Sequence, residues 1–237
     1  MLFRSQERFL RVKILHDPRL ERLLARLHAR SDEQTEALSA HFARFDNEDD
    51  GSALYAARTK QFRSDKLVAL DRDKAEFCYL LCRANNARRI VEIGTSYGVS
   101  TIYLAAALRD NIRASGGDGV VIGTEYEPEK AKAARQHFAE AGLSDLIDLR
   151  EGDLRETLRS LEGPLDFVLI DIWISMARPA LELVAPHLRP GAMVVCDNTE
   201  RSRADYADYF AFIHDPSKAF RTITLPFDGG LELSVRT

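Results

Sequence analysis

Short apolar runs alternate with longer amphipathic stretches from about residue 62 to the end of the chain. The runs predict strands at 90–93, 120–125, 146–149, 166–171, 192–196, 220–225 and 231–235. Helical periodicity predicts helices at about 71–83, 100–108, 129–141, 176–188 and 203–213. This alternation predicts an α/β fold with a doubly wound, mostly parallel seven-stranded sheet. No helix separates the final two strands, so the last strand is expected to be antiparallel.

Residues 1–60 differ from this pattern and are predicted to form a helical N-terminal extension, leaving 61–237 as the main domain. Leu20, Leu23, Leu24 and Leu27 recur at helical spacing and make one apolar face. The preceding Pro18 predicts a break in the first helix. The apolar face has two possible partners, the main domain or a second subunit, and the sequence does not choose between them.

A glycine-bracketed turn follows the first predicted strand. Gly94 and Gly98 leave room for a ligand to approach the backbone, and Ser100 and Thr101 are expected to cap the following helix. A strand end facing a helix N-terminus is a ligand site in open α/β sheets. Ser96 stands where a dinucleotide site requires its second glycine, so the turn favours a different nucleoside-type cofactor over a nicotinamide. The alternative is a tight strand–helix turn that binds no ligand.

Two acidic side chains end the next two predicted strands. Glu125 can accept hydrogen bonds from a ribose diol, and its alternative is a solvent-facing side chain in an acidic turn. Asp153 could accept from an adenine amino group, or it could cap the helix that begins at Leu154.

Asp171 ends the fourth predicted strand, and Asp197 and Asn198 end the fifth. If these strands are neighbours, two carboxylates and an amide oxygen converge, a ligand set that suits a hard cation such as Mg²⁺. Without a cation the carboxylates would repel each other. The alternative is that each residue caps the helix or turn that follows it.

Composition excludes several classes of function. The 237 residues carry a formal net charge of -4, which gives no basic footprint for nucleic acid, and no apolar run approaches a membrane span. The three cysteines are an odd number, and the charged N-terminus lacks a signal-peptide core. We therefore expect free thiols and a cytoplasmic protein.

The order and spacing of six segments resemble the cation-dependent O-methyltransferases of the catechol and caffeoyl-CoA type, which use S-adenosylmethionine (SAM). The segments are VEIGTSYGVSTIYLA at 91–105, GTEYEPEKA at 123–131, EGD at 151–153, DFVLIDIW at 166–173, LRPGAMVVCDN at 188–198 and DGGLELSVR at 228–236. The resemblance covers about 62–237 and implies a Rossmann-like methyltransferase fold, a small-molecule acceptor and a homodimer.

The resemblance also implies roles for individual residues. The methionine part of SAM is expected against Glu92, Gly94, Tyr97 and Ser100, with the Leu70 backbone near its amino acid group. Glu125 is expected to bind the ribose hydroxyls, and Asp153 is expected to lie beside the adenine. The expected ligands of a divalent cation, Mg²⁺ in the first place, are Asp171, Asp197 and Asn198. Asp171 adjoins both cofactor and metal, and it is the candidate catalytic residue.

Ile174 departs from the family pattern, which places a lysine base three residues after the first metal aspartate. We therefore expect metal-assisted O-methylation of a catechol-like hydroxyl without that base. One alternative is metal-independent transfer, with Asp171 and Asp197 binding a substrate amine. Others are a non-catalytic SAM-binding module and, disfavoured by Ser96, a nicotinamide oxidoreductase.

Overall fold

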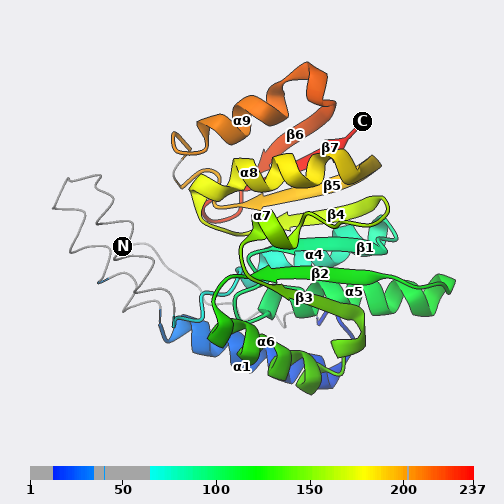
Figure 1. The fold of residues 1–237 in the computed structure, drawn as a ribbon. Helices are drawn as coiled ribbons and strands as arrows, with labels where there is room; N and C mark the ends of the chain where they lie inside the picture. Colours follow the sequence, from blue (N-terminus) through cyan, green and yellow to red (C-terminus); the bar gives the residue numbers. More distant parts are fainter. Residues whose placement is uncertain (1–12, 35–39, 41–64, 202) are drawn as a thin grey trace, which may run out of the picture.

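The computed structural model describes residues 13–34, 40, 65–201 and 203–237, which form one mixed sheet with helices on both faces (Figure 1). The strands are β1 (Arg89–Ile93), β2 (Val120–Glu125), β3 (Ile147–Glu151), β4 (Leu165–Ile170), β5 (Leu188–Asp197), β6 (Phe220–Leu225) and β7 (Leu231–Arg236). The helices are α1 (Pro18–Asp32), α4 (Arg72–Ala84), α5 (Val99–Ser115), α6 (Pro128–Ala141), α7 (Leu154–Thr157), α8 (Ile174–Val184) and α9 (Ala207–His214).

The strand order is β3-β2-β1-β4-β5-β7-β6, visible from bottom to top in Figure 1. β1 to β5 pair in parallel, whereas β7 runs antiparallel to both of its neighbours, β5 and β6. The predicted doubly wound sheet with an antiparallel last strand is therefore confirmed. The strand order reverses between β1 and β4, and ligands bind beyond the carboxyl ends of the strands at such a point.

Helices cover the two faces of the sheet in separate layers. α4, α5 and α6 contribute to one apolar core, and α7, α8 and α9 contribute to the other. Along β1, Ile90 enters the first core and Val91 the second, and both are fully buried. Burial on both faces explains why the central strands are continuous apolar runs.

The leucine face of α1 packs on the main domain, one of the two partners that the sequence left open. Leu20, Leu23, Leu24 and Leu27 are at most 2% exposed and join the core that contains α5 and α6. Asp17 caps α1 by accepting from the first backbone N–H groups. The rest of the predicted extension, 1–12, 35–39 and 41–60, lies outside the described residues, and the domain boundary stays a prediction.

Several element boundaries differ from the prediction, those of β5 and α9 among them. β5 begins at Leu188 and runs through Pro190 and Gly191, whereas the predicted strand began at residue 192, and its register with β4 shifts at the same level. A strand tolerates proline at such an irregularity because a ladder hydrogen bond is already missing there. α9 begins at Ala207 instead of near residue 203. Within the described ranges, no helix combines the length and apolarity needed to cross a membrane.

Candidate functional site

The turn after β1 packs tightly against the end of β4. Gly94 has φ +100°, and a Cβ there would lie 2.0 Å from the carbonyl oxygen of Asp171. The backbone N–H of Asp171 donates to the Ile93 carbonyl at 3.0 Å. A side chain at position 94 would therefore push the two strand ends apart, which explains the glycine physically.

Gly98 is the N-cap residue of α5, and the prediction that Ser100 and Thr101 cap this helix is wrong. The helix starts at Val99 with Gly98 as its N-cap at φ +80°, and no side chain caps it. A Cβ at Gly98 would lie 2.4 Å from the Phe138 ring, so close packing of α5 on α6 requires the glycine. The uncapped N–H groups of the first turn are free to bind a polar ligand group.

Glu92 is a fully buried carboxylate beneath this turn. It accepts hydrogen bonds from the hydroxyls of Thr95, at 2.9 Å, and of Thr101. The Thr101 hydroxyl therefore donates to Glu92 and does not cap the helix. Burial raises the pKa of Glu92 to about 7, although the hydroxyls of Ser100, Thr101 and Thr95 oppose that rise.

Glu125 turns inward from the end of β2 and is only 8% exposed, so the solvent-facing alternative is wrong. One carboxylate oxygen accepts from the Ser96 backbone N–H at 2.6 Å, and the other accepts from Glu127 N–H at 2.8 Å. Each oxygen keeps a second lone pair, so the carboxylate can still accept from a ribose diol.

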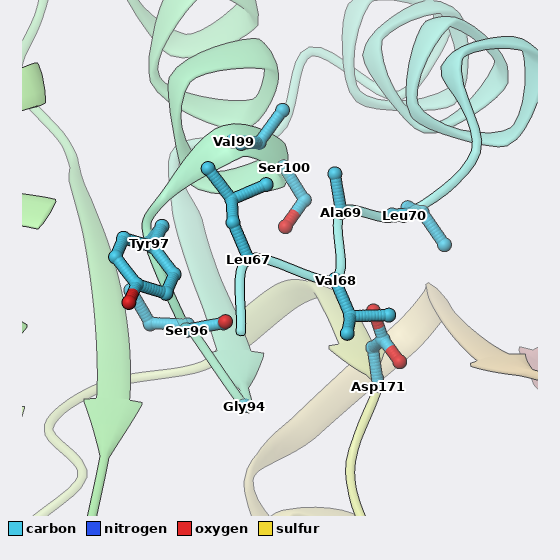
Figure 2. Close-up of a pocket in the computed structure, with 11 residues that line it drawn as sticks. Leu67, Val68, Ala69, Leu70, Gly94, Ser96, Tyr97, Val99, Ser100 and Asp171 are labelled. Atoms are coloured by element: carbon cyan, nitrogen blue, oxygen red, sulfur yellow. The ribbon is translucent and has the colours of Figure 1, made fainter. Parts of the chain in front are cut away.

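A pocket of about 220 Å³, open solvent included, lies where β1 and β4 end (Figure 2). Five predicted site residues line it: Leu70, Gly94, Tyr97, Ser100 and Asp171. In Figure 2 the segment 67–70 faces the turn at Gly94 and Ser96, with Val68 beside Asp171. The residues predicted for the methionine part of SAM are thus largely brought together.

Backbone hydrogen bonds tie the segment 67–70, here called the strap, to α1 and to Gln34 just after it. Ser31 Oγ accepts from the Ala69 backbone N–H at 3.0 Å, and Gln34 Oε1 accepts from that of Leu67 at 3.1 Å. Next to the strap, the Tyr97 hydroxyl donates to the Asp65 carbonyl at 2.9 Å. No pattern in the sequence indicated that α1 would hold one wall of the pocket.

Asp153 caps α7, the second of its two predicted roles. Its carboxylate accepts from the Arg155 backbone N–H at 2.9 Å and forms an ion pair with the Arg155 guanidinium at 2.5 Å. Asp153 does not line the pocket described above. Its place beside an adenine ring stays a prediction.

Asp171 and Asp197 lie at the same level on neighbouring strands, as the convergence argument required. They directly follow Ile170 and Cys196, which are register partners in β4 and β5. Burial, and then the charge of Asp197, raise the pKa of Asp171. Asn198 follows with φ +60°, and its amide nitrogen donates to Asp197 Oδ2 at 2.7 Å.

A buried lysine from α4 enters this acidic group. Lys74 is 1% exposed, and its Nζ lies 2.7 Å from Asp197 Oδ1 and 3.3 Å from Asp71 Oδ2. Asp71, at the N-cap of α4, makes no side-chain cap bond. Lys74 was not among the residues predicted for the site. Its spacing with Cys78 and Cys82, four residues each, was the available signal for a buried face.

The side chains as arranged do not fit a divalent cation. Hydrogen-bond donors from Lys74 and Asn198 occupy both oxygens of Asp197. The Asn198 amide presents nitrogen to this group, whereas a metal would require its oxygen. Among the described residues, no group of three or more His, Cys, Asp or Glu side chains could hold a metal ion.

Ile174 opens α8 and packs against the second core, so the position of the family lysine carries an apolar side chain. Trp173, which precedes it, is 38% exposed. All three cysteines are buried and free.

Part of the chain is similar in sequence to known methyltransferases. Residues 91–199 match a family described as "Methyltransferase domain". A catechol O-methyltransferase of Mycobacterium tuberculosis is 36% identical over 135 residues, which span 56% of this chain and 58% of that protein. The chain therefore covers less than two thirds of that relative.

Solved structures agree in fold. A putative O-methyltransferase from Klebsiella pneumoniae is 23% identical with a TM-score of 0.67, covering 93% of this chain and 91% of that one. The O-methyltransferase TomG from Streptomyces achromogenes, solved in complex with SAM, is 26% identical with a TM-score of 0.62, covering 80% and 91%. Residues 91–199 are therefore similar in sequence to methyltransferase domains, and the described chain shares its fold with solved O-methyltransferases.

Proposed function

We propose that this protein transfers the methyl group of SAM to a hydroxyl oxygen of a small-molecule acceptor. The observation that carries the proposal is the pocket, which brings Gly94, Tyr97, Ser100 and Asp171 to the switch point of the sheet. Ligands bind at that point in doubly wound folds. The SAM complex of TomG, a relative of the same fold, supports the choice of cofactor.

The cofactor would lie along the carboxyl ends of β1 and β2. Its methionine part would occupy the pocket under the strap, near Glu92 and the uncapped start of α5. Its ribose would reach Glu125, whose carboxylate is fixed by the Ser96 and Glu127 N–H groups. A carboxylate fixed in this way binds a diol without further ordering of its side chain.

Bound SAM supplies a methyl group on a positively charged sulfur. The chain's task is then to align an acceptor oxygen with that methyl and to exclude water. Asp171 lines the pocket at the end of β4, so its carboxylate adjoins the predicted methionine site. Trp173 at the same strand edge is proposed to wall an aromatic acceptor.

The class of acceptor rests on the mycobacterial relative, whose name states that it acts on catechol. We propose a phenolic hydroxyl as the acceptor group. The sequence also predicted metal assistance, but the contacts of Asp197 do not fit a divalent cation, and no step is assigned to one. Of the alternatives considered, metal-independent transfer is favoured by the Lys74–Asp197 ion pair. A substrate amine at Asp197 is not favoured, since that carboxylate already has a cation.

A product assay tests the proposal. The full chain is incubated with isotopically methyl-labelled SAM and a panel of catechols, monophenols and aliphatic or aromatic amines, and products are identified by mass spectrometry. The proposal expects label on a phenolic oxygen together with S-adenosylhomocysteine. Label only on nitrogen would overturn it. SAM binding without turnover of any acceptor would instead favour the non-catalytic module.

A further inference from the structure

We propose that Lys74 takes the place of the divalent cation, so that the acidic group at the ends of β4 and β5 carries its own cation. The inference rests on the proposed function, because it concerns the same site. It assigns a role to a residue that the family pattern does not mark in this chain.

Geometry supports a built-in ion. Lys74 Nζ lies 2.7 Å from Asp197 Oδ1, and the two side chains are 1% and 6% exposed. Lys74 reaches the site from α4, 123 residues away from Asp197 in the sequence. A lysine this deeply buried is rare unless it is paired, so the contact is specific.

A second carboxylate helps to hold the ammonium. Asp71 Oδ2 lies 3.3 Å from Lys74 Nζ, and Asp71 makes no side-chain cap bond to α4. Helix caps of this kind are stabilising, and here the aspartate pairs with Lys74 instead. Two oxygens from separate elements thus bind the ammonium, as they would bind a metal.

Asn198 is turned away from metal ligation. Its amide nitrogen donates to Asp197 Oδ2, while its Oδ1 lies against the turn at Gly229, where an added Cβ would approach it to 2.8 Å. The Asn198 backbone N–H donates to the Gly230 carbonyl at 3.1 Å. This orientation satisfies the second Asp197 oxygen, so both oxygens have a donor without a metal.

The presence of an ammonium in place of a metal ion affects which acceptors the site can use. A divalent cation can chelate two vicinal oxygens, whereas an ammonium buried on Asp197 offers no open coordination position. Activity should therefore not require a vicinal diol, and a single acidic hydroxyl should suffice. Lys74 is a positioning residue here, since it acts through Asp197 and does not line the pocket.

Metal binding by the full chain tests the proposal without any turnover. Mn²⁺ is titrated into the wild type, Lys74→Ala and Lys132→Ala, and bound metal is counted by electron paramagnetic resonance. Lys132 is the control because its side chain is 71% exposed on α6. Removing a positive charge beside the carboxylates should strengthen Mn²⁺ binding at least about tenfold in Lys74→Ala only, because like charges a few ångströms apart repel strongly. A Lys74→Ala/Asp197→Asn variant should lose that gain.

The Mn²⁺ titration of the wild type tests the proposal even if Lys74→Ala fails to fold. No stoichiometric Mn²⁺ site in the wild type supports it. One Mn²⁺ per chain that Asp197→Asn abolishes would overturn it, because Lys74 would then merely move aside for the metal. A folded Lys74→Ala that gains no Mn²⁺ would also overturn it. SAM titration of the same samples is independent of these outcomes, so failure of the proposed cofactor would be seen separately.

Discussion

The ammonium of Lys74 lies 2.7 Å from the carboxylate of Asp197, and both side chains are almost completely buried. The pair joins the start of α4 to the end of β5, and Asp197 is level with Asp171, which lines the pocket under the strap. It places a fixed positive charge where the sequence predicted a metal. We expect this contact and its surroundings to influence the stability of the fold, the binding of the cofactor and the choice of acceptor.

Lys74→Met should destabilise the fold by about 3–5 kcal/mol, because it leaves a buried, unpaired Asp197 carboxylate. Urea unfolding monitored by circular dichroism measures the change. Adding Asp197→Asn should recover about 1 kcal/mol or more through the coupling between residues in contact. Lys132→Met on the exposed face of α6 is the control. Equal effects of the two lysine variants would contradict a structural ion pair.

Gly94→Ala should weaken SAM binding at least about tenfold, equivalent to 1.4 kcal/mol, because the new Cβ would meet the Asp171 carbonyl. Gly116→Ala is the control for backbone strain alone. Gly116 also has a positive φ, +68°, but nothing lies within 4 Å of an added Cβ, so this variant introduces no steric clash. Calorimetry on both folded variants makes the comparison. Similar affinities would show that the turn at Gly94 does not contact the cofactor.

The strap should depend on α1. Ser31→Ala combined with Gln34→Ala removes two hydrogen bonds to the strap backbone, each contributing about 0.5–1.5 kcal/mol. SAM affinity should fall about tenfold if the strap must be ordered to bind SAM. Glu33→Gln, an exposed change at the end of the same helix, should leave affinity unchanged. Unaltered binding in the double variant would remove the strap from the cofactor site.

Glu92 should make stability fall as pH rises through the neutral range. Its pKa is raised from 4.5 to about 7, so the fold favours the protonated carboxyl. The resulting stabilisation is complete below about pH 4.5 and is lost as pH rises through about 7, by up to about 3 kcal/mol at 1.36 kcal/mol per unit. Urea unfolding between pH 4.5 and 8 measures it. Glu92→Gln should flatten this part of the profile, and an unchanged slope would contradict the assignment.

Local patterns predicted the fold well because each central strand is buried on both faces and each linking helix is amphipathic. Ile90 and Val91 belong to opposite cores, yet both appear in one apolar run. The sequence also predicted that the site lies at the glycine turn and at the ends of β4 and β5, because ligands bind at the carboxyl ends of parallel strands. β5 was the exception, since it begins before the predicted 192–196 and includes Pro190 and Gly191, which the register shift accommodates.

The contacts inside the site could not be predicted from local pattern. The Lys74–Asp197 pair spans 123 residues, and Ser31 meets Ala69 across 38. Nothing in the spacing of Asp171, Asp197 and Asn198 indicates which way the asparagine amide turns. Such pairings depend on how α1 and α4 pack on the finished sheet.

Calorimetric titration of SAM into the full chain, in buffer containing EDTA, tests the central claim most directly. The account predicts one SAM per chain with a Kd of about micromolar strength, near -8 kcal/mol, and the same affinity when Mg²⁺ replaces EDTA. Absence of binding in both buffers would contradict the account, since the Gly94 turn, the strap and Glu125 would then form no cofactor site.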